Sequence, residues 1–211
     1  QDAQVLYDTN QPQQALKKIK QIIEDHPSHI PAYLLQSKIL QDKGNTNAVL
    51  ALFNDALEQN PQASEIYIAR SEFYTNNGHQ SRAIMDIAKA IQLNPNQAKA
   101  HLQSGKIYYQ LREYSKAILD LRKALALGHT GQPLFIMLGQ AGQALENYED
   151  MTKSMSQAIQ LYPTTALFYY LRGSAYRALK HDKLACSDAR SASRLFESTL
   201  YYALRNEERC H

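Results

Sequence analysis

A pattern of small and bulky apolar residues recurs with a period of 34 along this chain of 211 residues. The segment "AIMDIAKAIQLNP" runs from Ala83 to Pro95, and a close copy, "AILDLRKALALGH", begins at Ala117. Within each copy the apolar residues are spaced by three or four, which places them on one face of an α-helix. One short unit cannot bury such a face alone. The period therefore predicts an array of small helical units that stack on one another.

The residue pattern predicts that each unit contains two helices joined by a short turn. The second helix ends near a proline or its replacement, at Pro27, Pro61, Pro95, His129, Pro163 and Glu197. The first helix carries an aromatic position followed four residues later by a small one: Tyr33 and Ser37, Tyr67 and Ser71, His101 and Gly105, Phe135 and Gly139, Tyr169 and Gly173. Small residues at a crossing let two helices approach to about 8–10 Å. Gly44 and Gly78 are expected to end first helices, because glycine adopts positive φ without strain.

The order of aromatic, small, bulky, Ala, bulky, Ala and Pro with a period of 34 resembles the tetratricopeptide repeat. The segment "HLQSGKIYYQLREYSKAILDLRKALALGH" (101–129) is the nearest copy, although no unit carries the family's usual Trp. The resemblance implies an all-α fold, a right-handed α-solenoid of helix-turn-helix repeats. We expect one array over 1–211, with a degenerate N-terminal unit (1–27), five 34-residue repeats (28–197) and a C-terminal capping helix (198–211).

Composition and motifs argue against several classes of function. The net charge is only +3, which gives no reason to expect a nucleic-acid partner. No apolar stretch approaches the roughly 18 residues that span a bilayer. The chain lacks GxxxxGK[ST], HExxH, GxSxG and CxxC. We therefore expect no enzyme activity, no cofactor and no metal. Cys186 and Cys210 are interpreted as two free thiols, with a bonded pair as the alternative.

The resemblance also implies that partners bind the concave face, which the first helices line. Three rows of side chains map to this face: Leu34, Ile68, Leu102, Ile136 and Tyr170; Lys38, Glu72, Lys106, Gln140 and Ser174; Gln41, Thr75, Tyr109, Gln143 and Arg177. The apolar first row has two interpretations, since it either packs against neighbouring helices or grips an apolar or amphipathic segment. A clamp for a terminal carboxylate is disfavoured, because the first row is mostly aliphatic and the second row has no Asn.

From these rows we predict a partner-binding set. It consists of Leu34, Lys38, Ile68, Glu72, Leu102, Lys106, Tyr109, Ile136, Gln140, Tyr170 and Arg177.

The fourth unit departs from the pattern. Gly142 stands where other units have a bulky residue, while Met151 and Met155 lie on the facing helix. One interpretation is that volume lost on one helix is regained on the other. The alternative is a hinge in the array.

The sequence thus predicts a scaffold or adaptor that holds a peptide or helical segment of a protein partner in its concave groove. The alternative is a self-assembling component of a bacterial envelope or secretion-type complex. The first residue is Gln, which fits a secreted bacterial protein after signal-peptide removal and fits an expression fragment equally well. A periplasmic location is expected on this basis, with a cytoplasmic one as the alternative.

Overall fold

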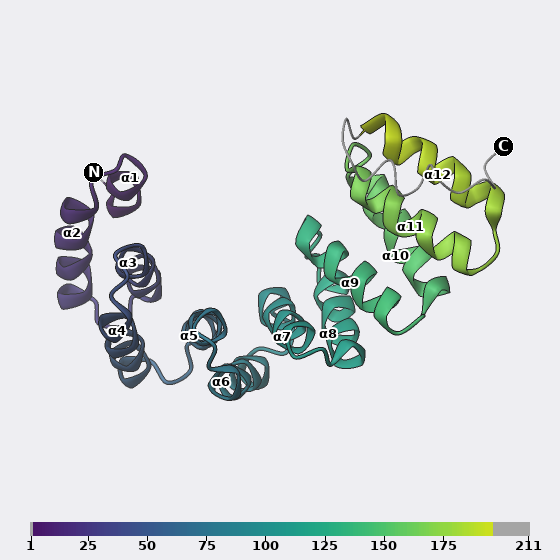
Figure 1. Ribbon diagram of the computed structural model, residues 1–211. Coiled ribbons are helices and arrows are strands. Elements are labelled where there is room, and N and C mark those ends of the chain that lie inside the picture. The colour runs from purple at the N-terminus through teal and green to yellow at the C-terminus, as the bar shows by residue number, and fades with distance from the viewer. Residues whose placement is uncertain (1, 196–211) are drawn as a thin grey trace. The chain divides into compact units, whose positions relative to one another are not determined.

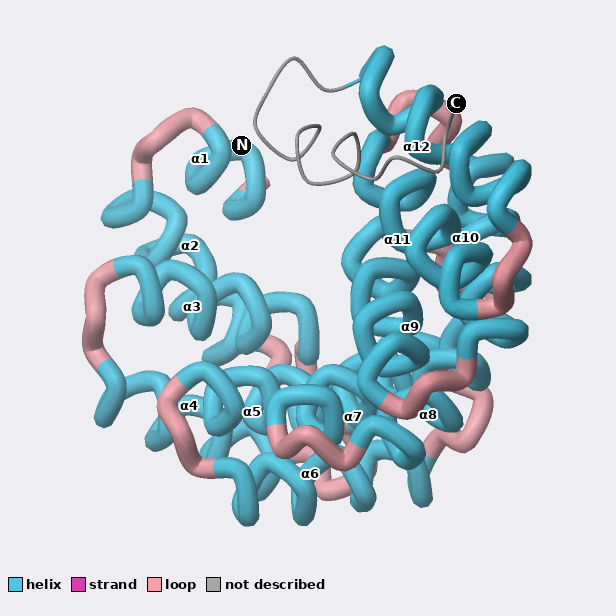
Figure 2. The backbone as a smooth tube through the Cα atoms, turned by 45° about the vertical axis from the view of Figure 1, so that its right-hand side comes forward, coloured by secondary structure: helices cyan, strands magenta, loops and turns pink. Residues whose placement is uncertain are grey.

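The computed structural model describes residues 2–195, and every regular element in that range is an α-helix (Figure 1). The helices are α1 (Ala3–Asp8), α2 (Pro12–Asp25), α3 (Ile30–Asp42), α4 (Thr46–Gln59), α5 (Ser64–Asn76), α6 (Gln80–Leu93), α7 (Ala98–Gln110), α8 (Tyr114–Ala126), α9 (Gln132–Ala144), α10 (Tyr148–Leu161), α11 (Ala166–Ala178) and α12 (Asp182–Leu195). Short loops join them (Figure 2). The prediction of an all-α fold built from helix hairpins is confirmed.

Each odd-numbered helix forms a hairpin with the helix that follows it, and the hairpins recur at the predicted period. Helix α1 has only six residues, so the first hairpin is the most reduced. The predicted capping helix over 198–211 lies outside the described residues. So does Cys210, one of the two cysteines that were interpreted as free thiols with a bonded pair as the alternative.

The helices fall into two compact units, residues up to Gln103 and residues from Ser104 onward, which are described separately. In the first unit, the aromatic rings of Phe53 and Phe73 meet edge to face among other buried apolar side chains of α3 to α5. A second cluster, which includes Ala15, Ile19 and Ile39, joins α1 and α2 to α3. The single array over 1–211 stays a prediction.

The second unit shows why the first helices carry a small residue at a fixed position. A Cβ atom on Gly105 would lie 2.7 Å from Cγ and 3.2 Å from the backbone nitrogen of Leu121 on the facing helix. At Gly139 it would lie 2.9 Å from a methyl carbon of Leu171. Contacts this short do not occur between real atoms, so these positions set how closely the helices approach.

Met151 packs beside Gly142 in the unusual fourth repeat. A Cβ atom on Gly142 would lie 3.3 Å from the Cβ atom of Met151, and Met151 is buried. The methionine side chain therefore occupies space next to the residue that lacks one.

A left-handed backbone conformation recurs with the same period in the turn of each hairpin. It occurs at Asn10, Gly44, Gly78, Arg112, Glu146 and Lys180, each with φ between 55° and 77°. The positive φ predicted for Gly44 and Gly78 is confirmed. Residues other than glycine and asparagine strain in this conformation, at about 1–2 kcal/mol each. The first unit thus uses favoured residues in its turns, whereas the second uses charged ones.

Candidate functional site

The predicted partner-binding residues of the first unit differ in how much surface they offer. Lys38 is exposed, and Leu34, Glu72 and Leu102 are half-buried. Ile68 is only 1% exposed, so it contributes to the core and offers no surface to a partner. Position in the first row therefore does not guarantee access to solvent.

In the second unit, the predicted rows of adjacent repeats meet. The Tyr109 hydroxyl on α7 donates a hydrogen bond to Oε1 of the exposed Gln140 on α9, at 2.7 Å. Burial is the main cause that raises the pKa of Tyr109, whose hydroxyl is a neutral donor at physiological pH, as an ordinary tyrosine hydroxyl is. The remaining predicted residues of this unit, Lys106, Ile136, Tyr170 and Arg177, are half-buried.

The first unit has a corresponding contact between successive first helices, and it involves Tyr7, which is not in the predicted partner-binding set. Lys38 on α3 places its Nζ 4.9 Å from the ring centroid of Tyr7 on α1, within the range of a cation–π contact. Tyr7 lies one full period before Gln41, so it belongs to the third row. Tyr7 was not predicted because the first hairpin is reduced and was not included in the rows. Its spacing of 34 residues from Gln41 would have identified it.

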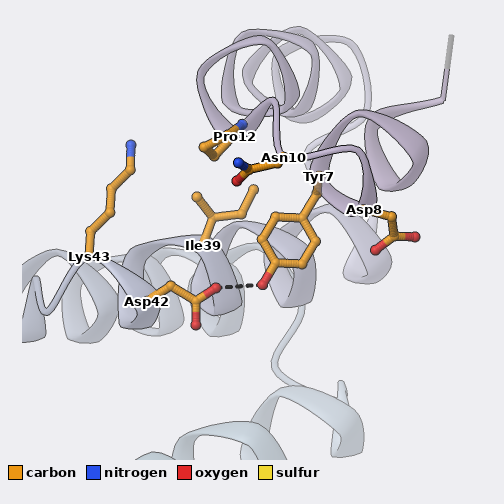
Figure 3. A pocket seen from close by; sticks show the side chains of 7 residues that line it. All are labelled: Tyr7, Asp8, Asn10, Pro12, Ile39, Asp42 and Lys43. Carbon is orange, nitrogen blue, oxygen red and sulfur yellow. Dashed lines mark hydrogen bonds between the residues drawn. The ribbon is translucent and has the colours of Figure 1, made fainter.

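Tyr7 also lines a pocket of about 500 Å³ between the first hairpin turn and the C-terminal end of α3 (Figure 3). The Tyr7 hydroxyl donates to Oδ2 of Asp42, a bond that raises the pKa of Tyr7. The other lining residues are Asp8, Asn10, Pro12, Ile39 and Lys43. In Figure 3 the Ile39 side chain lies between Asn10 and Asp42, and Lys43 extends along the opposite side from Tyr7.

The chemistry of this pocket suits binding. An apolar floor with charges of both signs at its rim can hold one side chain of a peptide, and its volume lies within the usual range for ligand sites. Within residues 2–195 no group of three or more His, Cys, Asp and Glu side chains could hold a metal ion. In the same range, no helix is long and apolar enough to cross a membrane.

A buried ion pair joins α5 to α6, and another joins α11 to α12. Arg70 on α5 donates to both carboxylate oxygens of Asp86 on α6, at 2.7 and 2.8 Å, and also to Asn54 on α4. These hydrogen bonds to Asp86 raise the pKa of Arg70. Arg172 on α11 makes the same contacts to Asp188 on α12 and to Ser156 on α10. Both arginines therefore tie three consecutive helices together, and we assign them a structural role.

A family model supports a relationship to known proteins. The model of the ChAPs (Chs5p-Arf1p-binding proteins) matches residues 3–127. Among curated proteins, none matches the chain at a significant level.

Solved structures with similar folds include tetratricopeptide repeat proteins. YrrB, described as a TPR protein with an unusual peptide-binding site, is 16% identical, with a TM-score of 0.73 over 88% of this chain and 95% of its own. PilW, a type IV pilus biogenesis factor, is 17% identical, with a TM-score of 0.71 over 99% and 93%. A tetratricopeptide repeat protein from Parabacteroides merdae is 21% identical, with a TM-score of 0.65 over 96% and 81%. At these identities the similarity establishes the fold.

Proposed function

The chain belongs to the family of ChAPs, and we propose that it is a protein-interaction scaffold that holds a peptide or helical segment of a partner. The family description concerns proteins that bind other proteins, Chs5p and Arf1p. The fold adds a physical reason, because stacked hairpins present extended surfaces suited to binding. We assign binding to the first-helix surface of each unit, which consists of that unit's predicted residues other than Ile68, together with Tyr7 in the first unit.

The observation that carries this proposal is the contact between rows of adjacent repeats. Tyr109 with Gln140, and Tyr7 with Lys38, each connect one first helix to the next through an aromatic ring and a polar side chain. Such pairs hold their side chains in place before a partner arrives. Less conformational entropy is then lost on binding, which favours affinity.

Two half-buried side chains of α7 are suited to supply the hydrophobic part of an interface. Leu102 and Tyr109 lie on the same helix, α7, and each keeps part of its side chain exposed. Desolvated residues near the middle of an interface contribute most of its binding energy, and aromatic residues are favoured among them. We therefore expect these two side chains to anchor the partner segment.

Substitution of the two anchors tests this assignment. Replacing Leu102 and Tyr109 together with Ala is expected to weaken capture of native partners more than tenfold, or roughly 1.4 kcal/mol. The matched control is Lys89→Ala on α6, an exposed position outside the predicted rows, which should leave capture unchanged. Circular dichroism must show equal helicity in all three proteins.

Cross-linking from single positions provides an independent test. A photoreactive amino acid at exposed Lys38 or Gln140 should attach to a partner protein, whereas one at Lys89 should not. Cross-links that form only from Lys89, or full capture by a folded Leu102/Tyr109 variant, would refute the first-helix surface as the binding site. Cross-links between copies of the chain would instead support self-assembly.

A further inference from the structure

The three hairpin turns of the second unit each present a leucine at the same position. Leu111 follows α7, Leu145 follows α9 and Leu179 follows α11, each one period after the last. Leu111 is 38% exposed, Leu145 is 43% exposed, and Leu179 is half-buried. The first helices of successive repeats run parallel, so these turns share one edge of the unit. We call Leu111, Leu145 and Leu179 the leucine edge.

The first unit builds the same turns without leucine. The equivalent positions there hold Thr9, Lys43 and Asn77, all exposed polar residues. The next residue in each of those turns is Asn or Gly, which suits its positive φ. The fold therefore requires neither leucine nor a strained residue in this turn.

Each turn of the second unit differs from the turns of the first unit in two respects: the leucine and the residue that follows it. After each leucine comes a charged residue with positive φ: Arg112, Glu146 and Lys180, all exposed. Backbone strain and exposed apolar surface are both unfavourable in a free protein, and here they coincide in the same three turns. Such coincident departures from local preference are expected where a surface has a binding role.

We propose that the leucine edge binds an amphipathic α-helix of a partner protein, on a surface distinct from the first-helix surface. Helix α9 contacts α11, and Tyr109 on α7 contacts Gln140 on α9. Helices that pack against each other are about 8–10 Å apart. A helix advances about 10.5 Å in seven residues, so apolar residues at intervals of seven would meet successive leucines.

The charges along the edge define the partner further. In chain order they are positive at Arg112, negative at Glu146 and positive at Lys180. Near Arg112, the carboxylate of Glu113 is paired with Lys116. The complementary helix therefore carries an acidic, a basic and an acidic residue beside its three apolar ones. Charge order of this kind discriminates between partners.

A designed peptide tests the proposal directly. The probe is a labelled helix of three heptads, with one leucine per heptad and neighbouring Glu, Lys and Glu in that order. A second peptide reverses these charges to Lys, Glu and Lys. Fluorescence anisotropy with the full chain at low salt should show binding of the first peptide and at least tenfold weaker binding of the second.

The chain offers a matched control for the apolar contact. Leu145→Gln should weaken binding of the first peptide at least tenfold, and the conservative variant Leu145→Met should retain it. Leu161→Gln should change binding less than twofold, because Leu161 is 46% exposed but lies at the other end of its hairpin, as the last residue of α10. Both positions are exposed, so both variants should keep wild-type helicity.

Several outcomes would overturn the proposal. These are failure of the first peptide to bind, equal binding of both peptides, or equal losses from Leu145→Gln and Leu161→Gln. A dimer that Leu145→Gln dissociates would identify the occupant as a second copy of the chain, which also contradicts a partner helix. None of these results depends on Leu102 or Tyr109, so the first-helix surface is tested separately.

Discussion

The ion pair between Arg172 and Asp188 allows a prediction that the chain itself suggests. Three helices meet at Arg172, whose guanidinium donates to both oxygens of Asp188 at 2.7 and 2.8 Å. The carboxylate of Asp188 is 6% exposed and the side chain of Arg172 is 19% exposed. The preceding repeat fills the same two positions of the period with Leu138 and Ser154. We predict that Asp188→Ser alone is strongly destabilising, whereas Arg172→Leu with Asp188→Ser is not.

The magnitude follows from burial. Removing one partner of a buried ion pair leaves the other charge without compensation, which costs about 3–5 kcal/mol. Because Arg172 retains some contact with solvent and lies near the rings of Tyr169 and Tyr176, we expect the lower value, about 3 kcal/mol. Replacing both charged partners with apolar or small residues is often neutral, so the double variant should lie within about 1 kcal/mol of wild type. Ser156 keeps its hydrogen bond to the Thr152 carbonyl oxygen in every variant.

Urea unfolding followed by circular dichroism measures these free energies, and a double-mutant cycle isolates the coupling between the two residues. Arg70 and Asp86 provide an independent replicate in the first unit, with the same pair of substitutions. If Asp188→Ser costs less than about 1 kcal/mol, or if the double variant loses as much as the two single variants combined, the pair does not act as a desolvated unit.

Three further predictions concern stability. Met151→Ala should lower the free energy of unfolding by about 2–5 kcal/mol, because it opens a cavity beside Gly142. Met85→Ala, at a residue that is 72% exposed, should cost little in the same urea assay. Similar losses for the two variants would contradict the packing of Met151 beside Gly142. Gly78→Ala should destabilise the protein by about 1 kcal/mol, because φ at Gly78 is 77° and no steric contact adds to the backbone strain. Glu146→Gly, at a φ of 55°, should instead stabilise the protein by about 0.5–1 kcal/mol. If both variants change stability in the same direction, backbone strain does not control these turns. Burial, with a smaller contribution from Asp55, raises the pKa of Tyr33 to about 12, so the stabilisation from the neutral Tyr33 hydroxyl is complete below pH 10 and is lost between about pH 10 and 12. The difference in unfolding free energy between wild type and Tyr33→Phe should therefore shrink by on the order of 2 kcal/mol over that range. A difference that stays constant with pH would exclude this contribution of the hydroxyl.

The fold could be predicted because the period encodes packing. The position of Gly105 holds Ser or Gly in all five repeats, because the facing helix leaves little room there. The position of Ala117 is Ala in four of its six occurrences, with Val49 and Met151 as the exceptions. The turns could be predicted only where glycine marks them, at Gly44 and Gly78. At Arg112, Glu146 and Lys180 the same backbone conformation is imposed on residues that do not favour it, so residue type alone gave no signal.

The candidate site was harder to predict because exposure depends on neighbours in other repeats. Ile68 and Leu34 occupy the same position of the period, yet one is buried and the other half-buried. A one-dimensional period places both on the same helix face and says nothing of the side chains packed above and below. Gln103 shows the same limit, because it lies in a position that holds Leu35 and Leu171 elsewhere, and its buried amide is satisfied by Thr75.

The ion pairs escaped sequence analysis for a different reason. Arginine and aspartate at this 16-residue separation are present in some repeats and absent in others, so neither residue is constant at its position of the period. Ser104 with Asp120 is a third solution, in which a hydroxyl donates to the carboxylate at 2.6 Å. In the two arginine–aspartate pairs, exchanging only one member leaves a buried charge without its partner. The two positions must therefore change together, so pairs of positions carry information that single positions of the period do not.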